Sequence, residues 1–509
     1  MKLSMKKIRG HHIAGLLCMV TFAVLLSIRG GLFAQKPQRV TGEALSAAER
    51  MAGKSHWMNI YQNGSRIGYA RRSVTKLQQG GFAASELVYM RLMAMGLVQE
   101  VHFTTTGILR PDLTLDKFTF ELASHLFSFR ARGEMTDDRT MALYVGEPGK
   151  EERVDIPLKQ RPYLGASLVE TAAAQGLAVG QSRTFPVFDP ATTGEKPVKL
   201  TVVSEETIPV MGEQVKALKV AVNFMGSDQY AWIGPDGEVL AEEGPLGIRM
   251  EKASIEQVFS GDYSSGETDM AQATSIDPGA VIAHPDKLKK LVIAVSGPGP
   301  EYLANLSGGR QEYADGLLTV TREDLPAAEV PGTEQNLPAD IAPFAAPSTF
   351  IESDNPEIAK TAAEIASSSD PLVVRARKIV AWVYENLEKR PVFSVPDAVQ
   401  TLKNRSGDCN EHSVLTAALA RAAGIPAQME VGVVYLKGKF FYHAWNSFYL
   451  DGRWVTADSA FGQFPADVTH LRFARGDARS QIDMMGVIGK LSLSIKDQET
   501  TGAVAKSEE

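Results

Sequence analysis

The chain has almost no cysteine. Its 509 residues contain two, Cys18 and Cys409, which lie far apart in the sequence. A protein zinc site needs several closely spaced cysteine or histidine ligands, and neither cysteine has such neighbours. The sequence therefore predicts no metal ion, although a cysteine and a histidine together could in principle bind zinc.

Excess positive charge and cofactor motifs are also missing. The formal net charge is −7, and no basic run occurs beyond the N-terminus, so nothing favours nucleic-acid binding. Residues 56–257 contain no phosphate-binding loop, nucleotide fingerprint or metal-ligand spacing. We therefore expect no cofactor and no nucleic-acid partner. The length and a hydrophobic fraction of 44% are typical of a globular protein of two or three domains.

The N-terminus has the layout of an export signal. An uncharged, mostly apolar run from Ile13 to Ile28 follows four basic residues, Lys2, Lys6, Lys7 and Arg9. A positive region followed by an apolar region is typical of secretory signals. Residues 1–34 are therefore predicted to be either a signal peptide cleaved near Ala34 or an uncleaved membrane anchor. The remaining chain is expected in the periplasm or anchored in the membrane facing it.

Export makes Cys409 unusual. Cys18 lies inside the export segment, so Cys409 is the one cysteine of the exported part and has no disulfide partner there. Thiols in oxidising compartments are normally paired. A solitary thiol is either buried and inert or retained for its reactivity.

Residues 56–260 are predicted to form a β-rich domain. Short β-type runs alternate with turn residues, as in Trp57–Tyr61 and Ile67–Ala70 around the turn Asn63-Gly64. Residues 165–176 are the one helix expected in this half. Its histidines His56, His102 and His125 stand alone, which indicates solvated or core residues. This half is interpreted as a scaffold or recognition domain.

Two linkers and a small module are expected next. Residues 261–285 are rich in serine, glycine, aspartate and threonine, and residues 326–347 are rich in proline and alanine. Between them, residues 286–325 contain two strand-like runs and are predicted to be a small β connecting module. A C-terminal domain of residues 350–480 follows, with helices predicted to begin at Asn355-Pro356 and Asp370-Pro371 and the second to stop at Pro391.

The chemistry-bearing residues lie in this last domain. Gly407-Asp408-Cys409 precedes a run with helical apolar spacing that ends at Gly424. Cys409 is therefore expected in the first turn of a helix, where free backbone donors and the helix dipole favour a thiolate. Gly407 is expected to permit a sharp turn that opens the sulfur to substrate. A backbone N–H nearby could bind a developing oxyanion.

A histidine and an aspartate follow Cys409 at spacings of 34 and 15 residues. His443 lies on a predicted strand and Asp458 at the end of the next, so a hairpin can bring them within hydrogen-bond distance. His443 is predicted to be the base and Asp458 its orienting group. Trp445 lies on the same strand face as His443. It is predicted to shield the pair and contact substrate, although an ordinary core tryptophan is equally consistent.

Other nearby side chains are weaker candidates. His412 lies three residues after Cys409 and could touch it on a helix, but it has no carboxylate partner of its own in the pattern. Glu411 and His470 are expected to be structural.

These motifs resemble the transglutaminase-like superfamily over about residues 350–475. They are Gly-Asp-Cys opening a helix, Ala-Gly-Ile-Pro closing it, His-Ala-Trp on a strand and Trp-x-x-x-Asp on the next. The resemblance implies a papain-like core with a catalytic triad of Cys409, His443 and Asp458, and hence an α+β chain with an N-terminal β-rich domain. This chain has Ser459 where the family commonly has proline. The animal pattern Gly-Gln-Cys-Trp is absent, which argues against calcium-dependent crosslinking.

The sequence therefore favours an exported cysteine-nucleophile enzyme that acts on amide bonds of a protein or peptide through a thioester. Water as acceptor would make it a peptidase or amidase, and an amine would make it a transglutaminase. A non-catalytic envelope module that binds peptide or glycan is the alternative. A purely structural scaffold would leave the lone Cys409 unexplained.

Overall fold

The computed structural model describes residues 52–124, 128–145, 151–174, 176, 178–189, 194–224, 227–297, 303, 306–327, 337–392, 396–476 and 490–500. The predicted export segment, residues 1–34 with Cys18, lies outside these ranges, as does His125. Among the helices in the described ranges, none is both long enough and apolar enough to span a bilayer.

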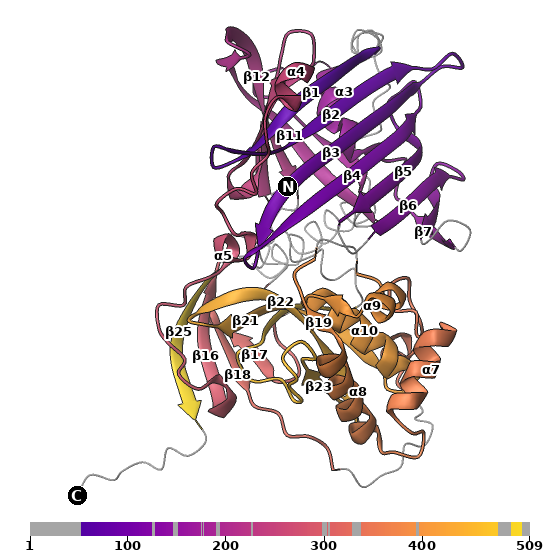
Figure 1. The fold of residues 1–509 in the computed structure, drawn as a ribbon, viewed down its shortest axis with the longest axis vertical. Helices are drawn as coiled ribbons and strands as arrows, with labels where there is room; N and C mark the ends of the chain where they lie inside the picture. Colours follow the sequence, from indigo (N-terminus) through magenta and orange to yellow (C-terminus); the bar gives the residue numbers. More distant parts are fainter. Residues whose placement is uncertain are drawn as a thin grey trace, which may run out of the picture.

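The fold is α+β, as predicted, with an N-terminal β-rich part and a C-terminal part that contains the longer helices (Figure 1). The N-terminal part is a single 15-stranded sheet whose strand order is β8-β7-β6-β5-β4-β3-β2-β1-β15-β14-β13-β12-β11-β10-β9. Its strands are β1 (Lys54–Gln62), β2 (Ser65–Lys76), β3 (Phe82–Ala94), β4 (Leu97–Leu109), β5 (Leu115–Ala123), β6 (Ser128–Met135), β7 (Thr140–Val145), β8 (Glu152–Pro157), β9 (Tyr163–Leu164), β10 (Ser182–Asp189), β11 (Gly194–Val210), β12 (Glu213–Phe224), β13 (Ser227–Ile233), β14 (Val239–Glu243) and β15 (Ile248–Ala253).

Successive hairpins build this sheet, and turn residues set their positions. Asn63 and Gly64 both have positive φ, 48° and 86°, as the predicted two-residue turn between β1 and β2 requires. β1 also pairs with β15, so the first and last strands of this part lie side by side. Helix α3 (Leu168–Ala174), after a 3-10 turn at Gly165–Ser167, packs Leu168 and Ala172 against β10–β12.

The C-terminal part combines four helices with the sheet β23-β22-β21-β24. The helices are α7 (Pro356–Ile365), α8 (Leu372–Asn386), α9 (Ala398–Asn404) and α10 (Cys409–Ala422); the strands are β21 (Ala427–Leu436), β22 (Lys439–Leu450), β23 (Arg453–Ala457) and β24 (Leu471–Gly476), with a short parallel pair of β19 (Glu388–Lys389) and β20 (Ser406–Gly407). Apolar side chains of α7, α8 and α10 pack with Met429, Phe448 and Val455 of the sheet.

The start of α7 is as predicted, but both ends of α8 differ from the prediction. Asn355 caps α7 through its side chain, as predicted. Asp370 does not cap α8, because Pro371 holds the N-cap position and the Asp370 carboxylate accepts a hydrogen bond from Lys378 at 2.7 Å. The helix also ends at Asn386, before Pro391, because the chain turns there into β19.

The connecting module is more than the expected pair of strands. β16 (Leu288–Ser296), β17 (Gln311–Ala314) and β18 (Leu317–Thr321) form a four-stranded sheet with β25 (Ser492–Thr500), in the order β17-β18-β16-β25. Leu291 and Ile293 of β16 belong to the same buried cluster as Val433 of β21 and Phe473 of β24. The module therefore shares a core with the sheet that carries His443.

The stretches interpreted as linkers also contain ordered elements. Just before the first linker, α4 (Ile255–Phe259) is a helix in addition to the one predicted for the N-terminal half, and it begins with a Ser254–Gln257 capping box. α5 (Met270–Thr274) is capped by Asp269, and Ile276 then pairs with Phe440 of β22 through two backbone hydrogen bonds. In the second linker, Ala342–Ala345 forms a 3-10 turn.

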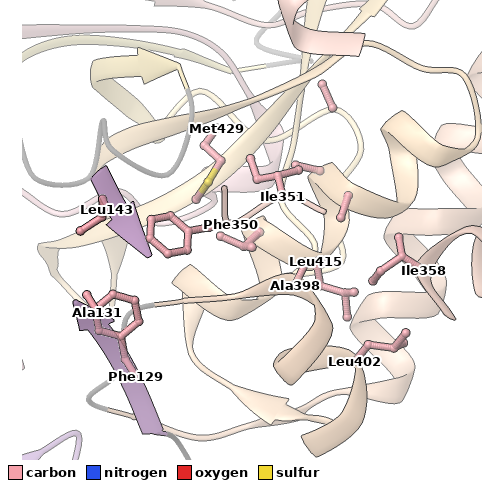
Figure 2. Close-up of a cluster of buried hydrophobic side chains, with 14 of the residues drawn as sticks. Phe129, Ala131, Leu143, Phe350, Ile351, Ile358, Ala398, Leu402, Leu415 and Met429 are labelled. Atoms are coloured by element: carbon pink, nitrogen blue, oxygen red, sulfur yellow. The ribbon is translucent and has the colours of Figure 1, made fainter. Parts of the chain in front are cut away.

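The two parts share a hydrophobic cluster (Figure 2). Phe350 lies between the strands of the N-terminal sheet and the C-terminal helices, and its ring centroid is 6.1 Å from that of Phe129 on β6. Leu143 of β7 and Met429 of β21 belong to the same buried cluster. This apolar contact links the β-rich part to the sheet that carries the candidate site.

Candidate active site

Cys409 is the first residue of α10, as predicted. The carboxylate of Asp408 accepts from the Asn410 backbone N–H at 2.9 Å, and Glu411 accepts from the Asp408 N–H at 3.0 Å, which forms a capping box. The first turn of a helix carries backbone N–H groups without intrahelical partners. The Asp408 carboxylate accepts from the Glu411 N–H as well, so the cap uses the N–H groups of both Asn410 and Glu411 and fixes Cys409 at the start of the helix.

Gly407 serves a different purpose from the expected sharp turn. Its φ is not among the positive values. Instead, the Glu411 side chain folds over it, and a Cβ at residue 407 would overlap the Cβ and Cγ of Glu411. The glycine therefore makes room for the side chain that closes the capping box at Cys409.

The Cys409 sulfur is half-buried and accepts a hydrogen bond from the backbone N–H of Ala444, the residue after His443. Burial raises the pKa of the thiol well above its ordinary value, and the charges of Asp408, Glu411 and Asp458 raise it further. Burial and these charges therefore oppose the thiolate that the helix start was predicted to favour. Loss of the thiol proton requires a base next to the sulfur.

His443 and Asp458 lie within hydrogen-bond distance. Nε2 of His443 is 2.7 Å from Oδ2 of Asp458. β22 and β23 pair as far as Asn446 and Ala457, so Asp458 directly follows the last pair and reaches back to the histidine. Since Nε2 faces the carboxylate, Nδ1 is the nitrogen left for the thiol.

All four hydrogen bonds to the Asp458 carboxylate come from nearby groups. Oδ1 accepts from the backbone N–H groups of Ala460 and Phe461, and Oδ2 accepts from His443 and His470. Burial alone would raise the pKa of Asp458, but the two histidines outweigh it and hold the pKa far below its usual range. The carboxylate therefore favours the charged form and is held by hydrogen bonds to both of its oxygens.

The sequence analysis placed His470 among structural residues, but it contacts Asp458 directly. Its Nε2 is 2.9 Å from Asp458 Oδ2, and its side chain is 0% exposed. Burial opposes its protonation, yet its hydrogen bonds to the carboxylates of Asp458 and Asp467 and the negative charges of both raise its pKa to about 9. No spacing rule links it to the triad, so only a search for histidines near Asp458 in the sequence could have flagged it.

Aromatic rings enclose His443 on both sides. Phe461 stacks on its ring at 4.8 Å between centroids, and Trp445 lies nearly parallel to it at 6.1 Å. Trp445 is 1% exposed, and its Nε1 donates to Glu430 at 2.9 Å. Trp445 is therefore a buried neighbour of the histidine, and its predicted contact with substrate stays a prediction. Phe461, which stacks on the same histidine, is half-buried.

His412 and Glu411 take supporting positions. His412 is 1% exposed, its Nδ1 lies 2.7 Å from the carbonyl of Asp408, and burial lowers its pKa. Among the described residues, no carboxylate accepts a hydrogen bond from its ring, so it lacks the orienting partner that His443 has.

Ser459, the departure from the family pattern, accepts a hydrogen bond from Thr416 on α10 at 2.7 Å and so connects the Asp458 loop to the helix of the nucleophile.

His443, Asp458 and His470 present ligand-type atoms within 4.8 Å of one another. Both histidine Nε2 atoms, however, point at the same carboxylate oxygen with hydrogen-bond distances of 2.7 and 2.9 Å. The nitrogens that a metal ion would need are thus already used as donors to Asp458. This arrangement fits a hydrogen-bonded triad better than a metal site.

A half-buried cysteine at a helix start, bonded to the backbone of the residue after His443, and a histidine held by a buried carboxylate are the components of a papain-like Cys-His-Asp site. Comparison with known families agrees: the model of the transglutaminase-like superfamily matches residues 359–459. The C-terminal part is therefore a transglutaminase-like superfamily domain. A second family, a protein of unknown function called DUF3108, matches residues 58–252 of the β-rich part.

Individual relatives are distant. Kyphoscoliosis peptidase from Mus musculus is 29% identical over 116 residues, which are 19% of this chain and 17% of that protein. The chain thus spans less than a fifth of that relative. A candidate cysteine protease from Cytophaga hutchinsonii aligns with a TM-score of 0.29 and 19% identity over 42% of this chain and 85% of that one. A β-barrel-like DUF1849 protein from Brucella abortus aligns with a TM-score of 0.31 and 13% identity over 39% of this chain and 94% of that one.

Proposed function

We propose that the C-terminal domain is a cysteine enzyme that cleaves amide bonds of proteins or peptides through a thioester on Cys409. One observation carries the proposal. The Cys409 sulfur accepts a hydrogen bond from the backbone N–H of Ala444. Ala444 directly follows His443 in the chain, and Nε2 of His443 lies 2.7 Å from Oδ2 of Asp458. A binding module would need neither a nucleophile nor an oriented base.

His443 is the general base and then the general acid of the first half-reaction. Nδ1 of His443 takes the thiol proton as Sγ of Cys409 attacks the carbonyl carbon. The oxyanion accepts a hydrogen bond from the backbone N–H of Cys409 itself. Protonated His443 then gives its proton to the leaving amine, the C–N bond breaks, and the acyl group remains on the sulfur as a thioester.

The second half-reaction restores the thiol. His443 takes a proton from water, the hydroxide attacks the thioester, and Cys409 leaves as a thiolate that recovers its proton from His443. An amine in place of water would give a new amide instead. The mouse relative, Kyphoscoliosis peptidase, is named as a peptidase, which favours water, so hydrolysis is the proposed outcome.

We also propose that this chemistry takes place outside the cytoplasm. The charge and hydrophobicity pattern of residues 1–34 supports export. Expression in a Gram-negative host followed by fractionation and N-terminal mass spectrometry tests this part. A chain that stays in the cytoplasm with its first residues intact contradicts it.

Turnover is tested with the full chain and an unfolded protein substrate in ¹⁸O water, with and without a labelled amine. Mass spectrometry should find ¹⁸O in new carboxyl ends with the wild type and none with Cys409→Ala or His443→Ala. Incorporation of the amine instead would identify acyl transfer. Absence of any product, together with equal peptide binding by wild type and Cys409→Ala, would favour the non-catalytic module.

A further inference from the structure

His470 lies outside the matched superfamily segment 359–459, yet it contacts the same carboxylate oxygen as His443. Its imidazole is fully buried, 12 residues after Asp458 in the chain. One oxygen thus receives a nitrogen from each of two histidines. An aspartate that only had to orient one base would not need the second.

The other side of the His470 ring is also held. Nδ1 lies 3.2 Å from the carbonyl oxygen and 3.3 Å from Oδ1 of Asp467. That carboxylate is fixed by Gln463 and by the backbone and hydroxyl of Thr469. With an acceptor at each nitrogen, both nitrogens carry protons. The ring is therefore an imidazolium built into the site.

The other groups that face His470 are aromatic rings and an arginine with its own carboxylate partner. The rings of Trp445, His443 and Phe461 surround it at 5.2, 5.8 and 6.1 Å. From the connecting module, Arg310 donates to the His470 backbone carbonyl at 3.4 Å and lies 3.8 Å from Glu323. Arg310 is thus compensated by Glu323, while Asp458 and Asp467 are the carboxylates bonded to the ring.

We propose that His470 is a positioning residue of this site: it clamps the Asp458 carboxylate opposite His443 and, as a fixed cation, weakens the pull of Asp458 on a proton at His443. The inference rests on the proposed function, because it assigns His443 the role of base. Its consequence is that the proton of the resting site stays on the Cys409 sulfur. Asp458 still sets the orientation of His443, but part of its charge is already offset.

This resting state suits a lone thiol in an oxidising compartment. Thiolates, not thiols, react with oxidants and electrophiles. A site that keeps Cys409 protonated until an amide carbonyl arrives protects the nucleophile that no disulfide protects. The raised pKa of Cys409 agrees with this arrangement.

The test compares the full-length wild type with His470→Gln, whose amide can still donate to Asp458 but carries no charge. The rate of Cys409 alkylation by iodoacetamide is measured from pH 5 to 9, with Cys18→Ser in every chain. Loss of the cation should let Asp458 favour the thiolate–imidazolium pair. The alkylation profile of His470→Gln should therefore extend to lower pH by about one unit, with a rate near neutral pH about tenfold higher than wild type.

Asp467→Asn provides a second variant in case His470→Gln fails to fold. It keeps the ring but removes one of its two carboxylates, so it should move the profile in the same direction by a smaller amount. Melting curves of each variant identify misfolded protein. An unchanged profile in both variants, with only a lower melting temperature, overturns the proposal and leaves His470 a purely structural role.

The two proposals fail in different ways. If the proposed hydrolysis is absent but the alkylation profiles move as described, only the function is refuted. If wild-type turnover depends on Cys409 while the profiles of both variants match the wild type, only the role of His470 is refuted.

Discussion

The side chain of Glu411 folds back over Gly407 and fills the space that a Cβ at residue 407 would need. Through this fold its carboxylate reaches the N–H of Asp408 at 3.0 Å and closes the cap of α10. Because Cys409 is the next residue, the position of the sulfur depends on a contact that only glycine permits.

Gly407→Ala should therefore displace Glu411 and loosen the start of α10. Overpacking of this kind costs about 1–3 kcal/mol, and loss of the cap adds to it. We expect a lower melting temperature and a loss of turnover of at least about tenfold. Gly165→Ala is the matched control, since its added Cβ meets Val187 at an ordinary 3.6 Å. Equal behaviour of the two variants would show that the contact is unimportant.

Trp445 and Phe461 should respond differently to substitution, although both rings flank His443. Trp445→Phe removes the donor to the buried Glu430, which should destabilise the fold by about 1–3 kcal/mol with little change in KM. Phe461→Ala removes a half-buried ring beside the site and should mainly raise KM. Kinetics and melting curves on the same protein preparations distinguish the two. A raised KM for Trp445→Phe at wild-type stability would support its predicted substrate contact.

Glu352 adds a pH-dependent instability near the link between the two parts. Burial raises its pKa, and the neighbouring Asp397 carboxylate raises it further. When the pKa of a carboxyl group is higher in the folded than in the unfolded chain, the free energy of unfolding of the protein falls as pH rises above about 4.3, the ordinary glutamate value. Glu352→Gln should therefore be more stable than wild type from neutral pH upward, and the gain should shrink in acid. Urea unfolding at pH 5 and pH 8 measures this, and a gain of equal size at both would contradict it.

His470 should cause a second fall in the free energy of unfolding, at higher pH than the fall caused by Glu352. Its pKa is about 9 in the folded chain and about 6.5 in the unfolded chain. Its contribution is therefore complete below pH ~6.5 and is lost as pH rises toward 9, by up to about 3 kcal/mol. Unfolding of wild type and His470→Gln across pH 6 to 9.5 should give converging stabilities at the alkaline end. Parallel curves would contradict the raised pKa.

Local patterns were enough to predict much of this structure. The Asn63-Gly64 hairpin, the cap at Asn355, the helix that starts at Cys409 and the strands that carry His443 and Asp458 all follow from short-range rules of turns, caps and periodicity. Each depends on residues only a few positions apart, so the sequence carries the signal directly.

Long-range pairing and side-chain competition were not predictable in the same way. β25 pairs with β16 although about 200 residues separate them, and no pattern in either segment predicts this pairing. The pKa of Cys409 is raised by burial and by carboxylates that include Asp458, and the fold alone determines the burial and the approach of Asp458. His470 reached Asp458 through a loop whose path is set by Gln463 and Asp467.

The most direct test of the triad is the pH dependence of Cys409 alkylation in wild type and His443→Ala, with Cys18→Ser in both chains. If His443 is the base for Cys409, the wild type should react at neutral pH at least about tenfold faster than the variant. Burial raises the pKa of the thiol in both proteins, so the difference comes from His443 taking the proton as the sulfur attacks, and the variant should react mainly above the ordinary thiol value of about 8.5. Identical profiles for the two proteins would show that His443 does not act on the thiol, and the proposed enzyme would have no base.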